Sequence, residues 1–150
     1  MKNIFFLFSP LMILTSFACN NDDDGPATPL DDCSIVYTID GQTMTENDIV
    51  VCALLDGTLN LGLIGSNNIQ IQVNELDGPG TFTIADNDVF ILVDLDDGTR
   101  LGAESGTVTV DQLTDSKATG TFSLTLRDIN DFMLTGPTVS LTNGQFNASF

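Results

Sequence analysis

Asp-Gly and Asn-Gly pairs divide the chain after residue 31, at Asp40-Gly41, Asp56-Gly57, Asp77-Gly78, Asp97-Gly98 and Asn143-Gly144. Such pairs suit the tight turns of β-hairpins, because these residues tolerate positive φ. Many segments between these pairs alternate apolar with polar residues, as in Ile-Gln-Ile-Gln-Val at 69–73. A period of two predicts strands that turn one face toward a core. No convincing helical pattern is found.

The turn pairs also predict strand registers. Two-residue turns at 40–41 and 56–57 bring apolar residues opposite one another: Tyr37 and Met44, Leu54 and Leu59, Cys52 and Leu61. A similar turn at Asn143-Gly144 would pair Leu141 with Phe146. The segment from Val89 to Val93 is continuously apolar, which favours a central strand covered on both faces.

About ten short antiparallel strands, with turns every 8–12 residues or so, are typical of sandwiches and up-and-down barrels. The many consecutive hairpins favour a meander. We therefore expect residues 31–150 to form a single all-β domain, an antiparallel meander that makes a two-sheet sandwich or a flattened barrel. The pattern leaves these two forms open.

Residues 1–18 have the parts of a secretory signal, with Lys2 followed by an apolar run that Pro10 interrupts. The run is too short to span a bilayer comfortably. The motif Ser16-Phe17-Ala18-Cys19 resembles a bacterial lipobox. The resemblance implies that Cys19 receives a diacylglycerol, that the signal is cut before it, and that the new amine is acylated. The alternative is an ordinary cleaved signal whose cysteine is incidental.

Asn and Asp residues follow Cys19 directly, and the run Cys-Asn-Asn-Asp-Asp-Asp resembles the start of many Bacteroidota lipoproteins. That resemblance implies an outer-membrane protein, lipid-anchored and facing the cell exterior, with the periplasmic face as the alternative. Residues 19–30 also suit a solvated acidic tether, because like charges extend a chain.

A second resemblance lies in the last third of the chain. It is carried by Gly106-Thr-Val-Thr-Val, Ala118-Thr-Gly-Thr-Phe-Ser-Leu and Val139-Ser-Leu-Thr-Asn-Gly-Gln-Phe. These segments are similar to the C-terminal signature of a family of small, uncharacterised Bacteroidota lipoproteins. The early part of the chain departs from that family, since it lacks Trp and carries two cysteines. The resemblance implies a fold and a location, and it implies no activity.

The charge of the chain excludes some classes of partner, and its cysteines predict a disulfide. After cleavage, Arg100, Lys117 and Arg127 remain against 21 acidic residues, and a chain this acidic repels nucleic acid and anionic headgroups. Cys33 and Cys52 are an even pair in an oxidising compartment, which predicts a disulfide. The alternative is two buried free thiols.

The chain contains no His, which excludes His-based metal sites and Ser-His-Asp or Cys–His catalysis. No glycine-rich loop introduces a helix, so nucleotide binding has no support. We therefore expect no enzyme. A carboxylate-based hydrolase is the alternative, because acidic residues are plentiful.

Calcium is the chemical hypothesis that the acids favour, since this ion takes carboxylate and turn carbonyl oxygens. The candidate ligands lie in two turns: Asp94, Asp96 and Asp97 in one, and Asp86 and Asp88 in the other. Asp128, Asn130 and Asp131 form a weaker third group. The alternative is that these are solvated turn acids, and we expect no other cofactor.

The sequence thus predicts a lipid-anchored cell-envelope β-domain, which we expect to be a monomer and a non-enzymatic binding or structural module. Its ligand would be a protein or a glycan at the cell surface. Phe132 and Met133, on the long connection 127–136, could form a contact patch or plug one end of the domain. A calcium-dependent adhesion module and a small acidic inhibitor are the alternatives.

Overall fold

The computed structural model describes residues 33–47, 49–62, 68–86, 88–131 and 136–150. The signal at 1–18 and the tether up to residue 30 lie outside these ranges. The described chain is built of β-strands with one short 3-10 turn, η1 (Ile84–Asp86), so the all-β prediction is confirmed. None of the described segments forms a helix with the length and apolar character needed to span a bilayer.

All strands belong to one antiparallel sheet in the order β2-β1-β10-β9-β8-β7-β5-β4-β3, with β6 paired to β8. The strands are β1 (Cys33–Ile39), β2 (Gln42–Glu46), β3 (Cys52–Leu55), β4 (Thr58–Leu61), β5 (Ile69–Val73), β6 (Gly80–Thr83), β7 (Val89–Asp94), β8 (Arg100–Thr114), β9 (Lys117–Asp128) and β10 (Thr138–Ser149). From β3 to β10 the strands follow a meander. The β1–β2 hairpin then adds to β10, so the first and last strands of the domain lie side by side.

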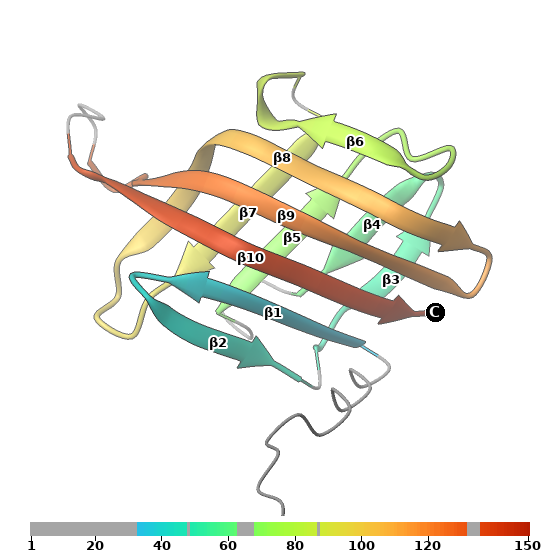
Figure 1. The fold of residues 1–150 in the computed structure, drawn as a ribbon, viewed down its shortest axis with the longest axis horizontal. Helices are drawn as coiled ribbons and strands as arrows, with labels where there is room; N and C mark the ends of the chain where they lie inside the picture. Colours follow the sequence, from blue (N-terminus) through green and yellow to red (C-terminus); the bar gives the residue numbers. More distant parts are fainter. Residues whose placement is uncertain (1–32, 48, 63–67, 87, 132–135) are drawn as a thin grey trace, which may run out of the picture.

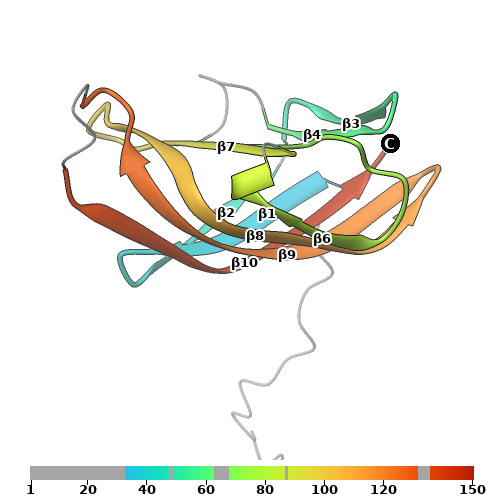
Figure 2. The ribbon, with the colours of Figure 1, turned by 90° about the horizontal axis from the view of Figure 1, so that it is seen from above.

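The sheet curls into a half-barrel with two layers (Figures 1 and 2). One layer holds β2, β1, β10, β9, β8 and β6, and the other holds β7, β5, β4 and β3. The layers are continuous where β8 pairs with β7, and they face each other without pairing at the opposite side. We call this unpaired side, between the β1–β2 hairpin and β3–β5, the open side. The fold is therefore one curled sheet and not two separate sheets.

The turn chemistry explains the first two hairpins. Asp40 and Gly41 have φ of 49° and 76°, and Asp56 and Gly57 have 49° and 74°, as a two-residue turn of this kind requires. The predicted registers are confirmed: Tyr37 with Met44, Leu54 with Leu59, and Cys52 with Leu61. These registers turn the apolar faces of both layers inward. The core contains Ile35, Leu59, Leu61, Ile71, Val93, Leu126, Leu141 and Phe146.

The predicted hairpin at Asn143-Gly144 is wrong. β10 runs through both residues, and its pairing with β9 shifts between Leu141 and Gly144, which marks a β-bulge. Asn143 has a φ of 53°, a conformation that suits a bulge as well as a turn. Gly144 lies against the ring of Phe122, where a Cβ would have no room. The glycine is therefore required by packing inside a long strand.

The prediction for residues 89–93 is half right. β7 is central, between β5 and β8, and Ile91 and Val93 are buried in the core. Phe90 points to the outer face and is 46% exposed. Leu92 lies on the same face and is only 7% exposed, so the outer face of β7 is covered at Leu92 and open to solvent at Phe90.

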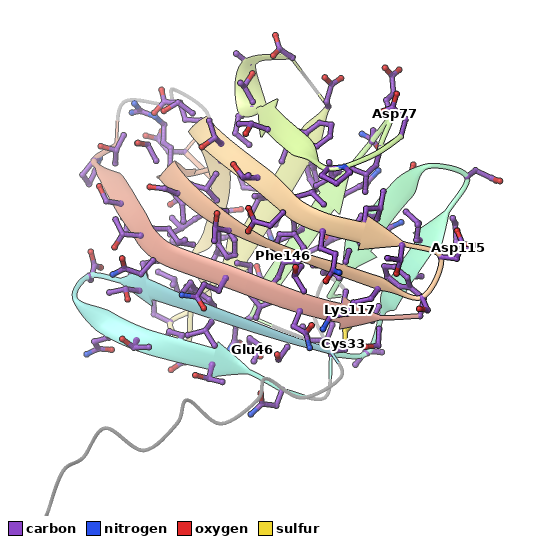
Figure 3. All side chains as sticks on the ribbon, turned by 45° about the vertical axis from the view of Figure 1, so that its right-hand side comes forward. Cys33, Glu46, Asp77, Asp115, Lys117 and Phe146 are labelled. Atoms are coloured by element: carbon purple, nitrogen blue, oxygen red, sulfur yellow. A yellow bond between two sulfur atoms is a disulfide. The ribbon has the colours of Figure 1, made fainter. Side chains whose placement is uncertain are left out.

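The predicted disulfide between Cys33 and Cys52 is confirmed, with an S–S distance of 2.08 Å and a Cα–Cα distance of 6.3 Å. It joins β1 to β3, which lie near opposite ends of the strand order. The bridge therefore crosses the open side, where no strand pairing joins the layers. Figure 3 shows Cys33 at the start of the domain.

Candidate binding site

Two of the hollows in the described surface lie on the outer face of β8, β9 and β10. Their volumes are about 380 Å³ and about 340 Å³. Both are lined mainly by short or polar side chains such as Thr121, Ser123 and Gln145, which are exposed. They are shallow depressions between rows of surface side chains.

A third hollow is smaller, about 140 Å³, but it reaches the core. It lies between the β1–β2 hairpin of one layer and the adjoining ends of β5 and β7 in the other. We call it the Tyr37 hollow. Its lining residues are Tyr37, Ile39, Asp40, Gln42, Met44, Asn68, Asp94, Leu95 and Asp96.

Asn68 connects the two walls of the Tyr37 hollow through two hydrogen bonds, one of which crosses the open side. The Asn68 side-chain Nδ2 donates to Oε1 of Glu46, at the end of β2, over 2.9 Å. The Asn68 carbonyl accepts from the backbone N of Asp94 over 2.7 Å. Asn68 therefore links β2 to β7 beside the hollow, and Figure 3 shows Glu46 on the edge strand.

The Asp94 carboxylate is held by an ion pair. Arg100 Nε donates to Oδ1 of Asp94 over 2.6 Å, and Arg100 Nη2 donates to Oδ2 over 3.0 Å. The two residues are opposite each other in β7 and β8. Such a two-point contact fixes the carboxylate geometrically. The other two acidic residues that line the hollow are Asp40 and Asp96.

Tyr37 is the buried end of the hollow, with an exposed fraction of 1%. Its hydroxyl forms no hydrogen bond with the residues that the structure describes. Burial raises the pKa of this phenol to about 12, and the charges of Glu46 and Asp96 add to the increase. Tyr37 is also the only tyrosine of the chain, which has no tryptophan.

This pKa predicts an alkaline limit to stability. Because the folded pKa of Tyr37 is about 12 and its usual value is 10.0, the protonated phenol favours the folded state below pH 10, and this contribution is lost as the pH rises from about 10 to about 12. Phenolate absorbance should therefore show a midpoint near 12 in the folded protein and near 10 in denaturant. A folded midpoint near 10 would contradict the buried position of Tyr37.

Several of the acids predicted to bind calcium form hydrogen bonds or ion pairs with different neighbouring residues. Asp97 Oδ1 accepts from the backbone N of Thr99 over 2.8 Å, and this bond lowers the pKa of Asp97. Asp86 accepts from the Thr83 hydroxyl, and Asp88 lies just before β7. Within the described ranges, no three acidic or cysteine side chains come close enough to hold a metal ion. Calcium binding at these residues stays a prediction.

Two acids of the third group, Asp128 and Asp131, accept hydrogen bonds from backbone N–H groups of the connection between β9 and β10. Asp128 Oδ1 accepts from the backbone N of Asn130 over 2.8 Å, and Asp131 Oδ2 accepts from the N of Gly136 over 3.0 Å. Arg127 donates to the Gly136 carbonyl over 2.8 Å and to both carboxylate oxygens of Glu104. Phe132 and Met133 lie outside the described residues.

A calcium test follows from these contacts. Because Asp94 and Asp97 already have partners, we expect the same thermal midpoint in excess calcium and in EDTA at matched ionic strength. Binding to the folded state alone at 100-fold saturation would add about 2.7 kcal/mol to the free energy of unfolding. A rise specific to calcium, with none in magnesium, would support the predicted calcium site.

Sequence reasoning singled out the turn with Asp94 and Asp96 and placed Tyr37 opposite Met44, but it did not bring these groups together. They meet because the sheet curls. The available signal was the Asp96 carboxylate in a turn and a tyrosine on an apolar face, and neither indicates a contact across the layers.

Comparison with models of known protein families, with curated proteins and with solved structures finds no match to this chain. The functional argument therefore rests on the sequence motifs and on the geometry described above.

Proposed function

We propose that this protein is a lipid-anchored, non-enzymatic binding module of the cell envelope, held in the outer membrane through Cys19 and facing the cell exterior. The lipobox-like motif supports the anchor. The observation that carries the binding role is the Tyr37 hollow, a pre-formed recess lined by a buried tyrosine whose hydroxyl has no hydrogen-bond partner among the described residues.

The position of the hollow suits an anchored receptor. The chain from Cys19 joins the domain at Cys33, where β1 begins, and β1 ends at Ile39 beside the hollow. Strand residues rise about 3.3 Å each, so this seven-residue strand carries the hollow roughly 20 Å from the point of attachment. The start of β1, where the tether joins, and the β1–β2 turn beside the hollow are thus at opposite ends of this strand (Figure 1).

A carboxylate-based hydrolase is the competing proposal, and the hollow gives it less support. That chemistry needs two carboxyl groups across a cleft, one of which must hold a proton. Asp94 is held in an ion pair by the Arg100 guanidinium over 2.6 Å. The chain has no His to act as a base.

The anchor is tested by replacing Cys19. We expect Cys19→Ala to move the protein from the membrane fraction to the soluble fraction, because stable anchoring depends on the acyl chains. Asn20→Ala, which leaves the thiol, is the matched control and should stay in the membrane. Antibody labelling of intact cells then reports the side of the membrane. Retention of Cys19→Ala in membranes would overturn the proposed anchor.

A further inference from the structure

We propose that the Tyr37 hollow binds an alkylammonium group, either a small primary amine or the side chain of a lysine in a partner protein. This inference rests on the proposed binding function and names the ligand class for the same site. Three features of the hollow carry it: its uncompensated charge, its apolar walls and its unused hydroxyl.

Negative charge surrounds the hollow without a matching cation. Arg100 is paired with Asp94, and in the part of the chain that the structure describes, Asp40 and Asp96 have no ion-pair partner. Glu46 stands near enough to act electrostatically on Tyr37. The protein as a whole has a formal net charge of −17. A positive ligand would therefore be attracted from a distance and held at the rim of the hollow.

The walls between the acids are apolar. Ile39, Met44 and Leu95 line the hollow and can cover a short aliphatic stem. Tyr37 adds a hydroxyl oxygen that can accept a hydrogen bond from an ammonium N–H. An acidic rim with apolar walls suits a ligand that has both a charge and a stem.

The size of the hollow limits the ligand. Its volume is about 140 Å³, and a water takes about 30 Å³ in the liquid, so it holds a group of roughly five non-hydrogen atoms. The end of a lysine side chain has this size. A bare divalent metal ion would need several oxygen ligands, and no suitable set of three acidic side chains exists in the described ranges.

The natural probe of binding is Tyr37 itself, because no other tyrosine and no tryptophan contributes fluorescence. The mature protein, purified in a neutral detergent, is titrated with n-butylammonium chloride, and Tyr37 fluorescence is recorded. We expect a saturable change that weakens as sodium chloride is added, since salt screens exposed charges. The uncharged analogue n-butanol should give no saturable change.

Two variants with the same change of charge locate the effect. Asp96→Asn removes an acid from the hollow and should raise the dissociation constant roughly fivefold, the upper range for an exposed ion pair. Asp115→Asn removes an exposed acid from the turn between β8 and β9, far along the sheet from the hollow (Figure 3). It should leave the dissociation constant unchanged. The thermal midpoint of each variant confirms that it is folded.

The outcomes separate the possibilities. Equal titrations with n-butylammonium and n-butanol, or equal effects of the two Asp→Asn variants, would overturn the proposal. Saturation by calcium chloride and not by n-butylammonium would overturn it in favour of a metal site. None of these results bears on the membrane partition of Cys19→Ala, so the proposed anchor stands or fails separately.

One further ligand distinguishes the two sources of the amine. The ligand is lysine acetylated at Nα and methylamidated at its carboxyl group. It presents the free ε-ammonium on a blocked backbone, as in a polypeptide. If it saturates the fluorescence change as n-butylammonium does, the hollow accepts a lysine of a partner protein. If only n-butylammonium binds, the hollow is closed to polypeptides and its ligand is a free amine. Either result supports the alkylammonium site.

Discussion

Replacing Cys33 and Cys52 together by serine is expected to lower the free energy of unfolding by about 3 kcal/mol, since the bridge closes a loop with a sequence separation of 19. For a domain of this size the thermal midpoint should fall by about 10 °C. The bridge crosses the open side, where no strand pairing joins β1 to β3. Its loss therefore also frees one end of the half-barrel. Thermal unfolding followed by circular dichroism measures the change.

The control for this prediction uses the reductant. Adding dithiothreitol should lower the midpoint of the unmodified protein toward that of the double serine variant, and it should not affect the variant. Equal midpoints for the oxidised protein and the double variant would show that the open side is held by packing and by contacts such as Asn68 to Glu46. The single serine variants are less informative because each leaves an unpaired thiol.

Local parts of the fold could be predicted because local chemistry determines them. Asp40-Gly41 and Asp56-Gly57 adopt the positive φ that their residue types allow, and each turn fixes the register of its hairpin. The same registers place Cys33 and Cys52 on apolar faces, and the structure joins them. These inferences need only the residues within one hairpin or an even count of cysteines.

The errors have a common physical origin. Asn143-Gly144 has the composition of a turn, but Gly144 is required by the Phe122 ring of the neighbouring strand. Phe90 continues an apolar run, yet the outer face of β7 is open to solvent at this residue while it is covered at Leu92. In both cases the deciding contact comes from another strand, or from its absence. Such a contact cannot be predicted from the residue types of one segment.

The Tyr37 hollow shows the same limit at the candidate site. Tyr37 comes from β1, Asn68 precedes β5, and Asp94 ends β7. Only the curl of the sheet brings these three residues together. Sequence reasoning could find acids in turns and a tyrosine on an apolar face, but not the recess that they share.

Phe146→Ala is expected to cause a large loss of stability. Phe146 is 2% exposed, and its ring occupies the space over Gly120 on β9, where a side chain would collide with it. Truncating a buried Phe to Ala costs about 3–5 kcal/mol, because transfer free energy is lost and a cavity remains. That is a large part of the about 5–15 kcal/mol that stabilises a typical domain. Urea unfolding measures the loss as a shift of the midpoint.

Phe90→Ala is the matched control, since it makes the same chemical change on the outer face of β7. Phe90 is 46% exposed and stands opposite Gln72 of β5. Truncating this exposed side chain leaves no cavity. The free energy of unfolding should therefore fall by less than about 1 kcal/mol, the scale of a cross-strand contact. Similar losses for both variants would mean that Phe90 is covered in solution and that the outer face of β7 is not open to water at this residue. A large difference would assign the stability to the ring between the layers and leave Phe90 as a surface residue.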